Sequence, residues 1–207
     1  MRIYDISLPL NDQTIIYPGN PGIFIEPHHT VPEYPTNLSK ISFGSHTGTH
    51  VDAPRHIDTS AIGVDKISLE ACIGPCRVLD ITDVNEKITI ADLEKHDVKT
   101  GERILAKTKN SLRGFTQFYD DSIYLDGAAA DWLARKGILL FGIDWLSIKK
   151  RGGEDTRPHT SLLRKSIVIF EGLDLSQVEP GEYQFIGLPL RLTDLDGAPA
   201  RAVLIKN

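Results

Sequence analysis

The sequence predicts a single α/β domain, spanning residues 1–207, in which a mixed or barrel-like β-sheet is covered by a few helices. Short runs rich in β-branched and aromatic residues outnumber the segments with helical periodicity. Gly, Pro, Asn or Asp separates these runs, as turns between strands require. The chain has 207 residues, of which 41% are hydrophobic, enough to bury one core. A mixed sheet or barrel fits this pattern better than a doubly wound sheet.

The expected strands are dense in Ile, Val, Leu, Phe and Tyr, and they are bounded by turn residues. They are Arg2–Ser7, Gly22–Glu26, Arg77–Ile81, Arg103–Ala106, Ile138–Ile143, Ser166–Phe170, Tyr183–Leu188 and Arg201–Ile205.

Three segments are expected to be helices. Ile67–Ile73 carries apolar residues at helical spacing. Ile90–His96 follows Thr89, a suitable N-cap residue, and has an acidic residue in its first turn. Ala128–Lys136 is rich in alanine, and the glycine that follows it suits a left-handed C-terminal cap.

Composition and charge exclude several classes of protein. The formal net charge is −5, with Lys and Arg scattered along the chain, so the sequence predicts no binding to nucleic acid or to an anionic membrane. Asp5 comes too early for the apolar region of a secretory signal, and no run approaches the roughly 18 apolar residues of a membrane span. We therefore expect a cytoplasmic protein.

The two cysteines, Cys72 and Cys76, do not have the spacing of a redox pair or of a zinc knuckle. We expect them to be reduced, buried thiols near the end of a helix.

A histidine-rich segment stands out in the loop-rich region Asn11–Asp65. His46, His50, Asp52 and His56 combine three imidazoles with one carboxylate, the ligand types that bind zinc and similar divalent ions. A glycine, two threonines and a proline in this segment disfavour a helix, so we expect an extended strand or a turn. If the segment is an extended strand, the alternation of side chains places all four residues on one face, which predicts a metal site.

Further ligands must come from elsewhere in the chain, and His159 and Glu171 are the leading candidates. Glu171 ends the apolar run that begins at Ser166, and a carboxylate at the end of a buried strand needs a compensating partner such as a metal. The alternative is that Glu171 is the first exposed residue after the strand.

Other polar segments have weaker indications. The charged turn Lys149–Asp155 is expected to be a lid or a solvated loop, and Arg151 or Arg157 could face the pocket. His28 and His29 could line the pocket or lie exposed, and Trp145 is expected in the core.

The segment from His46 to His56 resembles the His-x-Gly-Thr-His-x-Asp-x-Pro-x-His signature of the metal-dependent hydrolases called the cyclase family. This family includes bacterial kynurenine formamidases and isatin hydrolases. The resemblance extends over nearly the whole chain, through the stretches Tyr17–Gly19, Gly142–Asp144, Glu171–Leu173 and Asp196–Ala202. It implies a mixed α/β fold of the swivelling β/β/α type, built around a barrel-like sheet.

The resemblance also implies a site with two divalent ions, zinc first and manganese as the alternative. His46, His50 and Asp52 would hold one ion, and Asp52 would also reach the second. His159 would bind the second ion, and Glu171 would bridge or complete both.

His56 resembles the general acid/base of the family, and Tyr17 stands where many members carry a tryptophan that stacks on the substrate. The implied activity is hydrolysis of an amide C–N bond, with N-formylkynurenine as the leading substrate. Tyr17 and the lysines that follow Trp145 leave an isatin-type lactam or ester hydrolase as a second interpretation. A non-catalytic metal-binding domain is the third. Family members are commonly homodimers or larger homo-oligomers, and the same is expected here.

Overall fold

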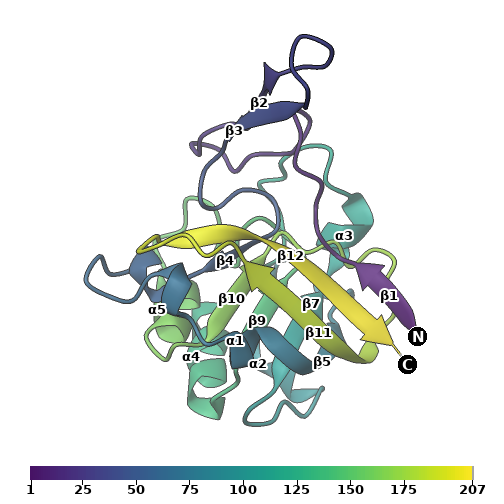
Figure 1. The fold of residues 1–207 in the computed structure, drawn as a ribbon. Helices are drawn as coiled ribbons and strands as arrows, with labels where there is room; N and C mark the ends of the chain where they lie inside the picture. The colour runs from purple at the N-terminus through teal and green to yellow at the C-terminus, as the bar shows by residue number, and fades with distance from the viewer. Residues whose placement is uncertain (207) are drawn as a thin grey trace.

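A closed ring of β-strands forms the centre of the computed structural model, which describes residues 1–206 (Figure 1). Asn207, the last residue of the predicted domain, lies outside the described residues. The sheet has eight strands in the order β1-β12-β11-β5-β7-β9-β10-β4. Because β4 also pairs with β12, every strand except β1 belongs to the ring. The strands are β1 (Arg2–Asp5), β4 (His50–Asp52), β5 (Ile73–Asp80), β7 (Arg103–Lys107), β9 (Leu140–Ile143), β10 (Val168–Glu171), β11 (Gly181–Pro189) and β12 (Gly197–Lys206).

The ring is mixed, as the sequence predicts. Strands β5, β7, β9 and β10 are parallel neighbours, whereas β11, β12 and β4 join antiparallel. Along β10, Val168 and Phe170 belong to one buried cluster, to which all ring strands contribute. Ile169 points to the other cluster, beneath the helices. Since successive side chains of a strand alternate, one set of residues fills the ring and the other packs under the helical layer.

The helices are short and few. They are α1 (Leu69–Cys72), α2 (Ile90–Glu94), α3 (Lys109–Arg113), α4 (Gly127–Lys136) and α5 (Arg157–Leu163), with 3₁₀ turns at Pro54–His56 and Val64–Lys66. Helices α4 and α5 pack against each other and lie on one side of the ring (Figure 1). None of the helices among the described residues has the length and apolar character needed to cross a membrane.

Two of the predicted helices are confirmed together with their caps. Thr89 forms a capping box with Asp92 at the start of α2, because each side chain bonds the backbone N–H of the other residue. Helix α4 ends at Gly137, which has a left-handed conformation with φ of +69°.

The predicted helix Ile67–Ile73 is wrong at both ends. Only Leu69–Cys72 is helical, and Ile73 already belongs to β5, where it pairs with Ile186 of β11. Strand pairing therefore outweighs the local helical periodicity. Helices α3 and α5 and the short strands β6 (Lys87–Ile88) and β8 (Tyr124–Leu125) were not expected, whereas β4 lies within the segment expected to be a strand or a turn.

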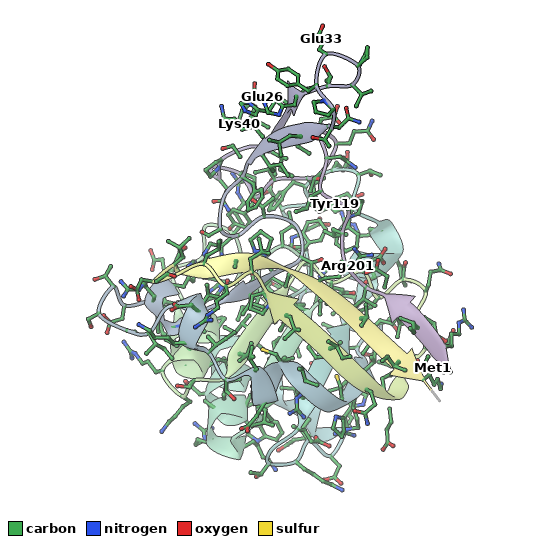
Figure 2. All side chains as sticks on the ribbon, viewed as in Figure 1. Met1, Glu26, Glu33, Lys40, Tyr119 and Arg201 are labelled. Atoms are coloured by element: carbon green, nitrogen blue, oxygen red, sulfur yellow. The ribbon has the colours of Figure 1, made fainter. Side chains whose placement is uncertain are left out.

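A two-stranded arm projects from the ring (Figure 1). It consists of β2 (Phe24–His29), β3 (Leu38–Ser42) and the loop between them. The strand predicted at Gly22–Glu26 is thus shifted, and β3 was not expected. Figure 2 shows Glu33 at the tip of the arm and Glu26 and Lys40 below it. The side chains of Glu26 and Lys40 form an ion pair at 2.9 Å across the two strands.

Candidate metal centre

The histidine-rich segment combines the two expected conformations, a strand and turns, so the side-chain alternation predicted for one continuous strand is wrong. Only His50–Asp52 is strand, whereas His46 lies in a turn and His56 ends a 3₁₀ turn. Gly48, with φ of +59°, interrupts the extended backbone, and a proline begins the 3₁₀ turn. The four side chains nevertheless converge, because the turns on both sides of β4 fold back toward one another.

Two glycines bring the start of β4 against the end of β10. A Cβ atom at Gly172 would lie 2.3 Å from the carbonyl oxygen of Gly48, so the two backbones approach more closely than any side chain permits. Thr49 joins them, because its hydroxyl donates to the carbonyl of Gly172 at 2.5 Å and accepts from the N–H of Leu8 at 2.8 Å. This contact places the candidate ligands of the two strands side by side.

Glu171 lies at that junction and is buried, with 3% of its surface exposed. The alternative that it is an exposed residue beyond the strand is therefore wrong: it is the last residue of β10. His159 reaches the same point from α5, and its Nε2 lies 3.1 Å from Glu171 Oε1. Both candidates from outside the histidine-rich segment thus belong to the cluster.

The distances within the cluster are short. His46 Nδ1 lies 2.8 Å from Asp52 Oδ1, and His50 Nε2 lies 3.6 Å from the same oxygen. His159 Nε2 lies 3.5 Å from Asp52 Oδ2, and His50 Nε2 lies 3.3 Å from Glu171 Oε2. Asp52 therefore stands at the centre, with histidine nitrogens on both of its oxygens.

The buried polar atoms of the cluster fit a divalent metal. The carboxylate oxygens of Asp52 are buried, and among the described residues only histidine nitrogens lie within reach of them; the Nε2 of His50 is buried without a hydrogen-bond partner. Unpaired buried groups of this kind are costly, and a cation satisfies them together. Two groups of potential ligands, each with its atoms within 4.8 Å of one another, share Asp52. They are His46, Asp52 and His56, and His50, Asp52 and Glu171. Imidazole and carboxylate donors suit zinc and manganese.

The orientation of His50 is fixed by the backbone. Its Nδ1 donates to the carbonyl oxygen of Gly48 at 2.9 Å, because a carbonyl can only accept. The Nε2 atom is therefore the nitrogen with a free lone pair, and it points at Asp52 and Glu171. Histidines that bind metals typically donate the N–H of the other ring nitrogen to a carbonyl or carboxylate in this way.

The electrostatics of the cluster favour ionised carboxylates. Burial alone would raise the pKa of Asp52, but the charge and hydrogen bonding of His46 hold it below its ordinary value. Burial and Asp52 act to raise the pKa of Glu171, yet His159 and His50 keep it lowered. Burial acts to lower the pKa of His46, but Asp52 outweighs this effect and raises the pKa to about 9. The metal-free cluster thus holds a proton on His46 at neutral pH.

His56 occupies a different position at the mouth of the cluster. One third of its side chain (33%) is exposed, whereas those of His50 and Asp52 are fully enclosed. Burial lowers the pKa of His56 below its ordinary value, an effect that Asp52 only partly opposes. A neutral imidazole beside the ligands, open to a substrate, suits proton transfer.

A small cavity of about 240 Å³ opens over the cluster. Tyr17, predicted to contact substrate, lies on its wall and packs edge-on against Phe118 with ring centroids 5.3 Å apart. The other lining residues are Asn20, His46, His56, Leu146, Ser147, Lys149, His159 and Glu171.

Several other predicted candidates lie elsewhere. Arg151 and Arg157 do not line the cavity, and they form ion pairs with Asp120 and Asp155. His28 and His29 stack on each other in the arm. Trp145 is buried, as expected.

Sequence analysis missed Lys149 as a lining residue, and it gave no role to Asp196. Asp196 Oδ2 lies 2.6 Å from His46 Nε2, although the two residues are 150 positions apart. The only local signal for Asp196 was its place in a stretch that resembles the family.

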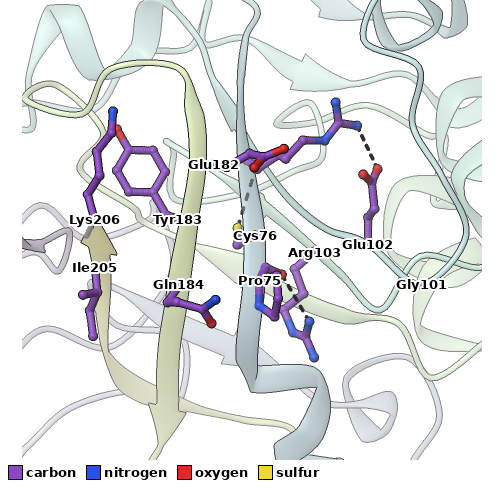
Figure 3. A pocket seen from close by; sticks show the side chains of 11 residues that line it. Pro75, Cys76, Gly101, Glu102, Arg103, Glu182, Tyr183, Gln184, Ile205 and Lys206 are labelled. Carbon is purple, nitrogen blue, oxygen red and sulfur yellow. Dashed lines mark hydrogen bonds and ion pairs between the residues drawn. The ribbon is translucent and has the colours of Figure 1, made fainter.

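A larger hollow of about 540 Å³ shares no residue with the cluster (Figure 3). It is lined by Arg103, whose guanidinium donates to the backbone carbonyls of Ala71, Pro75 and Glu70. Cys76 also lies there, and burial raises the pKa of its thiol. Burial raises the pKa of Cys72 to about 11. Both thiols are free and buried, and their raised pKa values disfavour the reactive thiolate form.

Comparison with known proteins agrees with the ring fold and the histidine–carboxylate cluster. The family described as "Putative cyclase" matches residues 4–150. Kynurenine formamidase of Bacillus anthracis is 35% identical over 97% of this chain and 95% of its own length. A solved structure described as a potential metal-dependent hydrolase with cyclase activity has 35% identity and a TM-score of 0.88, covering 98% of this chain and 96% of the other.

The fold and the site together define a metal-centred α/β ring protein, and the chain belongs to the cyclase family. Isatin hydrolase A of Ralstonia solanacearum has the same fold, with a TM-score of 0.83 over 99% of this chain and 92% of the other. At 23% identity, that likeness concerns the fold alone.

Proposed function

We propose that this enzyme is a metal-dependent amidohydrolase that cleaves N-formylkynurenine into kynurenine and formate. One observation carries the metal site and with it the hydrolase assignment: among the described residues, the buried oxygens of Asp52 face only the nitrogens of three histidines. The relatives named kynurenine formamidase, which match nearly the whole chain, support the choice of substrate.

In the proposed site, His46, His50 and Asp52 hold one divalent ion, and Asp52, His159 and Glu171 hold a second. Zinc is the first choice because the donors are mainly imidazoles, and manganese is the alternative. Such an ion acidifies water at neutral pH and polarises a carbonyl oxygen.

His56 is the proposed catalytic residue. Its neutral imidazole takes a proton from the water that adds to the formyl carbon. It then gives this proton to the amine nitrogen as the C–N bond breaks, so formate and a free aromatic amine leave. Tyr17 would stack on the aromatic ring and orient the formyl group toward the cluster.

A lactam such as isatin is the second candidate substrate. Lys149 and Tyr17 both line the cavity, and the ammonium group of Lys149, which donates to the carbonyl of Gly153, would attract the carboxylate that ring opening releases. A purely metal-binding role is less well supported, since His56 lies open to the cavity beside a full ligand set.

Hydrolysis assays separate these candidates. We expect the purified protein to turn over N-formylkynurenine with kcat/KM of about 10⁴ M⁻¹s⁻¹ or more, and to lose this activity on chelation. Zinc or manganese should restore it. Faster turnover of isatin would replace the proposed substrate, and no turnover of any amide, lactam or ester by metal-loaded protein would contradict the enzyme assignment.

We also propose a homodimer or larger homo-oligomer. The arm exposes large apolar side chains, among them Phe24 at 69% and Ile41 at 56%, and an isolated two-stranded sheet is marginally stable in water. A second copy of the chain would cover this surface. Sedimentation should show a dimer that Phe24→Asp together with Ile41→Lys converts to monomer, and a wild-type monomer would contradict the proposal.

We place the enzyme in the cytoplasm, where its two free thiols would stay reduced.

A further inference from the structure

His46 differs from the other histidines of the cluster because both of its ring nitrogens face carboxylates. Its Nδ1 lies 2.8 Å from Asp52 Oδ1, and its Nε2 lies 2.6 Å from Asp196 Oδ2. The same oxygen of Asp196 accepts a hydrogen bond from the hydroxyl of Ser45 at 3.1 Å. Asp196 is thus joined to the turn that carries His46. It precedes β12, which pairs with one edge of β4, whereas Glu171 lies on β10, which pairs with the other edge.

We propose that Asp196 is a positioning residue for the metal centre. Its carboxylate accepts the proton of His46 Nε2–H, which leaves Nδ1 as the nitrogen that faces Asp52 and binds the ion. This inference rests on the metal-binding part of the proposed function. His50 achieves the complementary arrangement through the carbonyl of Gly48, so the two histidines present opposite nitrogens to one centre.

The sheet holds Asp196 in place for this task. The N–H of Ala53, directly after β4, donates to the backbone carbonyl of Asp196 at 2.9 Å. The next residue, Gly197, pairs with Asp52 in the β12–β4 ladder. Strand pairing therefore fixes the carboxylate of Asp196 relative to the strand that carries the central ligand.

Gly197 completes the seat for the imidazole ring. A Cβ atom at Gly197 would lie 2.9 Å from His46 Cε1 and 2.7 Å from the carbonyl of Val51. No side chain fits in that space, so the ring of His46 packs directly on the β12 backbone. The carboxylate of Asp196 fixes the rotation of the His46 ring, and the absence of a side chain at Gly197 lets the ring lie against the β12 backbone.

A role for Asp196 through His56 is less consistent with the geometry. His56 Nδ1 lies 3.9 Å from Asp196 Oδ2, beyond hydrogen-bond distance, whereas His46 Nε2 is in direct contact. The two roles make different predictions, because loss of a ligand-positioning group weakens metal binding before any substrate is added.

The test is a zinc titration of Asp196→Ala with a competing chelator, without substrate. We expect the site that contains His46 to bind zinc about 10- to 100-fold less tightly in this variant than in the wild type. Asp196→Asn retains an acceptor oxygen and should recover part of the loss. Asp194→Asn is the matched control: Asp194 is another half-exposed aspartate, with φ of +54°, a conformation that asparagine tolerates, and it pairs with Lys66 rather than a histidine.

The visible absorption of the cobalt-substituted protein supplies a second readout, because it reports ligand geometry. A changed spectrum in Asp196→Ala and an unchanged one in Asp194→Asn support the proposal. Wild-type affinity and spectrum in Asp196→Ala would overturn it, as would a loss confined to turnover. If the alanine variant does not fold, the same criteria apply to Asp196→Asn. A wild-type protein that binds no divalent ion would instead overturn the proposed function itself.

Discussion

Two buried aspartates in this fold have opposite surroundings. Asp144 follows β9 and is completely buried, but its oxygens accept from the N–H and hydroxyl of Thr108 and from the N–H of Ser111. Asp52 ends β4 and is equally buried, yet among the described residues its oxygens face only histidine nitrogens and no backbone or hydroxyl donor.

The difference shows how a structural carboxylate is distinguished from a ligand. The chain itself supplies the donors for Asp144, which ties the start of α3 to the sheet. Around Asp52 it supplies only histidine nitrogens, which bind cations when they are deprotonated. Burial raises the pKa of Asp144, whereas the histidines keep that of Asp52 lowered.

The largest effect is expected from Asp52→Asn. An uncharged amide would hold a divalent ion more weakly than the carboxylate, so both zinc binding and hydrolysis should be lost, with turnover reduced at least about 10³-fold. Zinc should raise the melting temperature of the wild type but not of this variant. Calorimetry and the hydrolysis assay check the result, and a variant that keeps zinc and activity would contradict the central role of Asp52.

His56→Ala sharpens the comparison by removing a group that is proposed not to be a ligand. Turnover should fall about 10² to 10⁴-fold, because the proton transfer loses its carrier. Zinc content should be unchanged. If elemental analysis instead shows an ion missing, His56 is a ligand, as its place in one of the two ligand groups would permit.

Asp144→Ala should produce the reverse of the Asp52 phenotype. Buried donors of Thr108 and Ser111 would lose their acceptor, which should lower the free energy of unfolding by about 2–4 kcal/mol. Zinc affinity of the folded variant should stay at the wild-type value. Urea unfolding and zinc titration measure the two quantities, and weaker zinc binding without loss of stability would reverse the assignment.

The smallest expected effect is the release of protons when zinc binds. His46 has a pKa of about 9 in the metal-free protein, so at pH 7 it is protonated and zinc must displace that proton. Zinc binding at pH 7 should release about one proton or more, and its affinity should rise with pH until pH 9. Calorimetry in buffers of different ionisation enthalpy measures the release. An affinity independent of pH between 6 and 9 would contradict this linkage.

The ligand types of the site are predictable from the sequence, but their arrangement is not. His46, His50, Asp52 and His56 were found because they lie close together in sequence and match a family signature. Their convergence depends on the turn at Gly48, which local strand periodicity does not show.

Contacts across the fold were harder to predict. The surroundings of Glu171 depend on the pairing of β10 with β4, and no local pattern distinguishes a buried strand end from an exposed one. Asp196 meets His46 only because β12 closes the ring against β4. Helix α5, which carries His159, is short and marginal by propensity, and its packing on α4 stabilises it.

The fold class and most long strands followed from composition and turn residues, whereas the arm and the shortest strands did not. Strands of two or three residues, such as β4 and β6, have too few positions to show alternation. The arm lies outside the ring and its apolar residues are exposed, so their hydrophobicity does not indicate a place in the core.

The most direct test is the number of divalent ions that the wild-type chain retains. Metal-free protein would be loaded with zinc, passed through gel filtration and analysed for zinc per chain, with Asp52→Asn treated in parallel. Two ions per wild-type chain and none in the variant are the predicted result. Folded wild-type protein that retains no zinc and no manganese would contradict a metal centre built around Asp52.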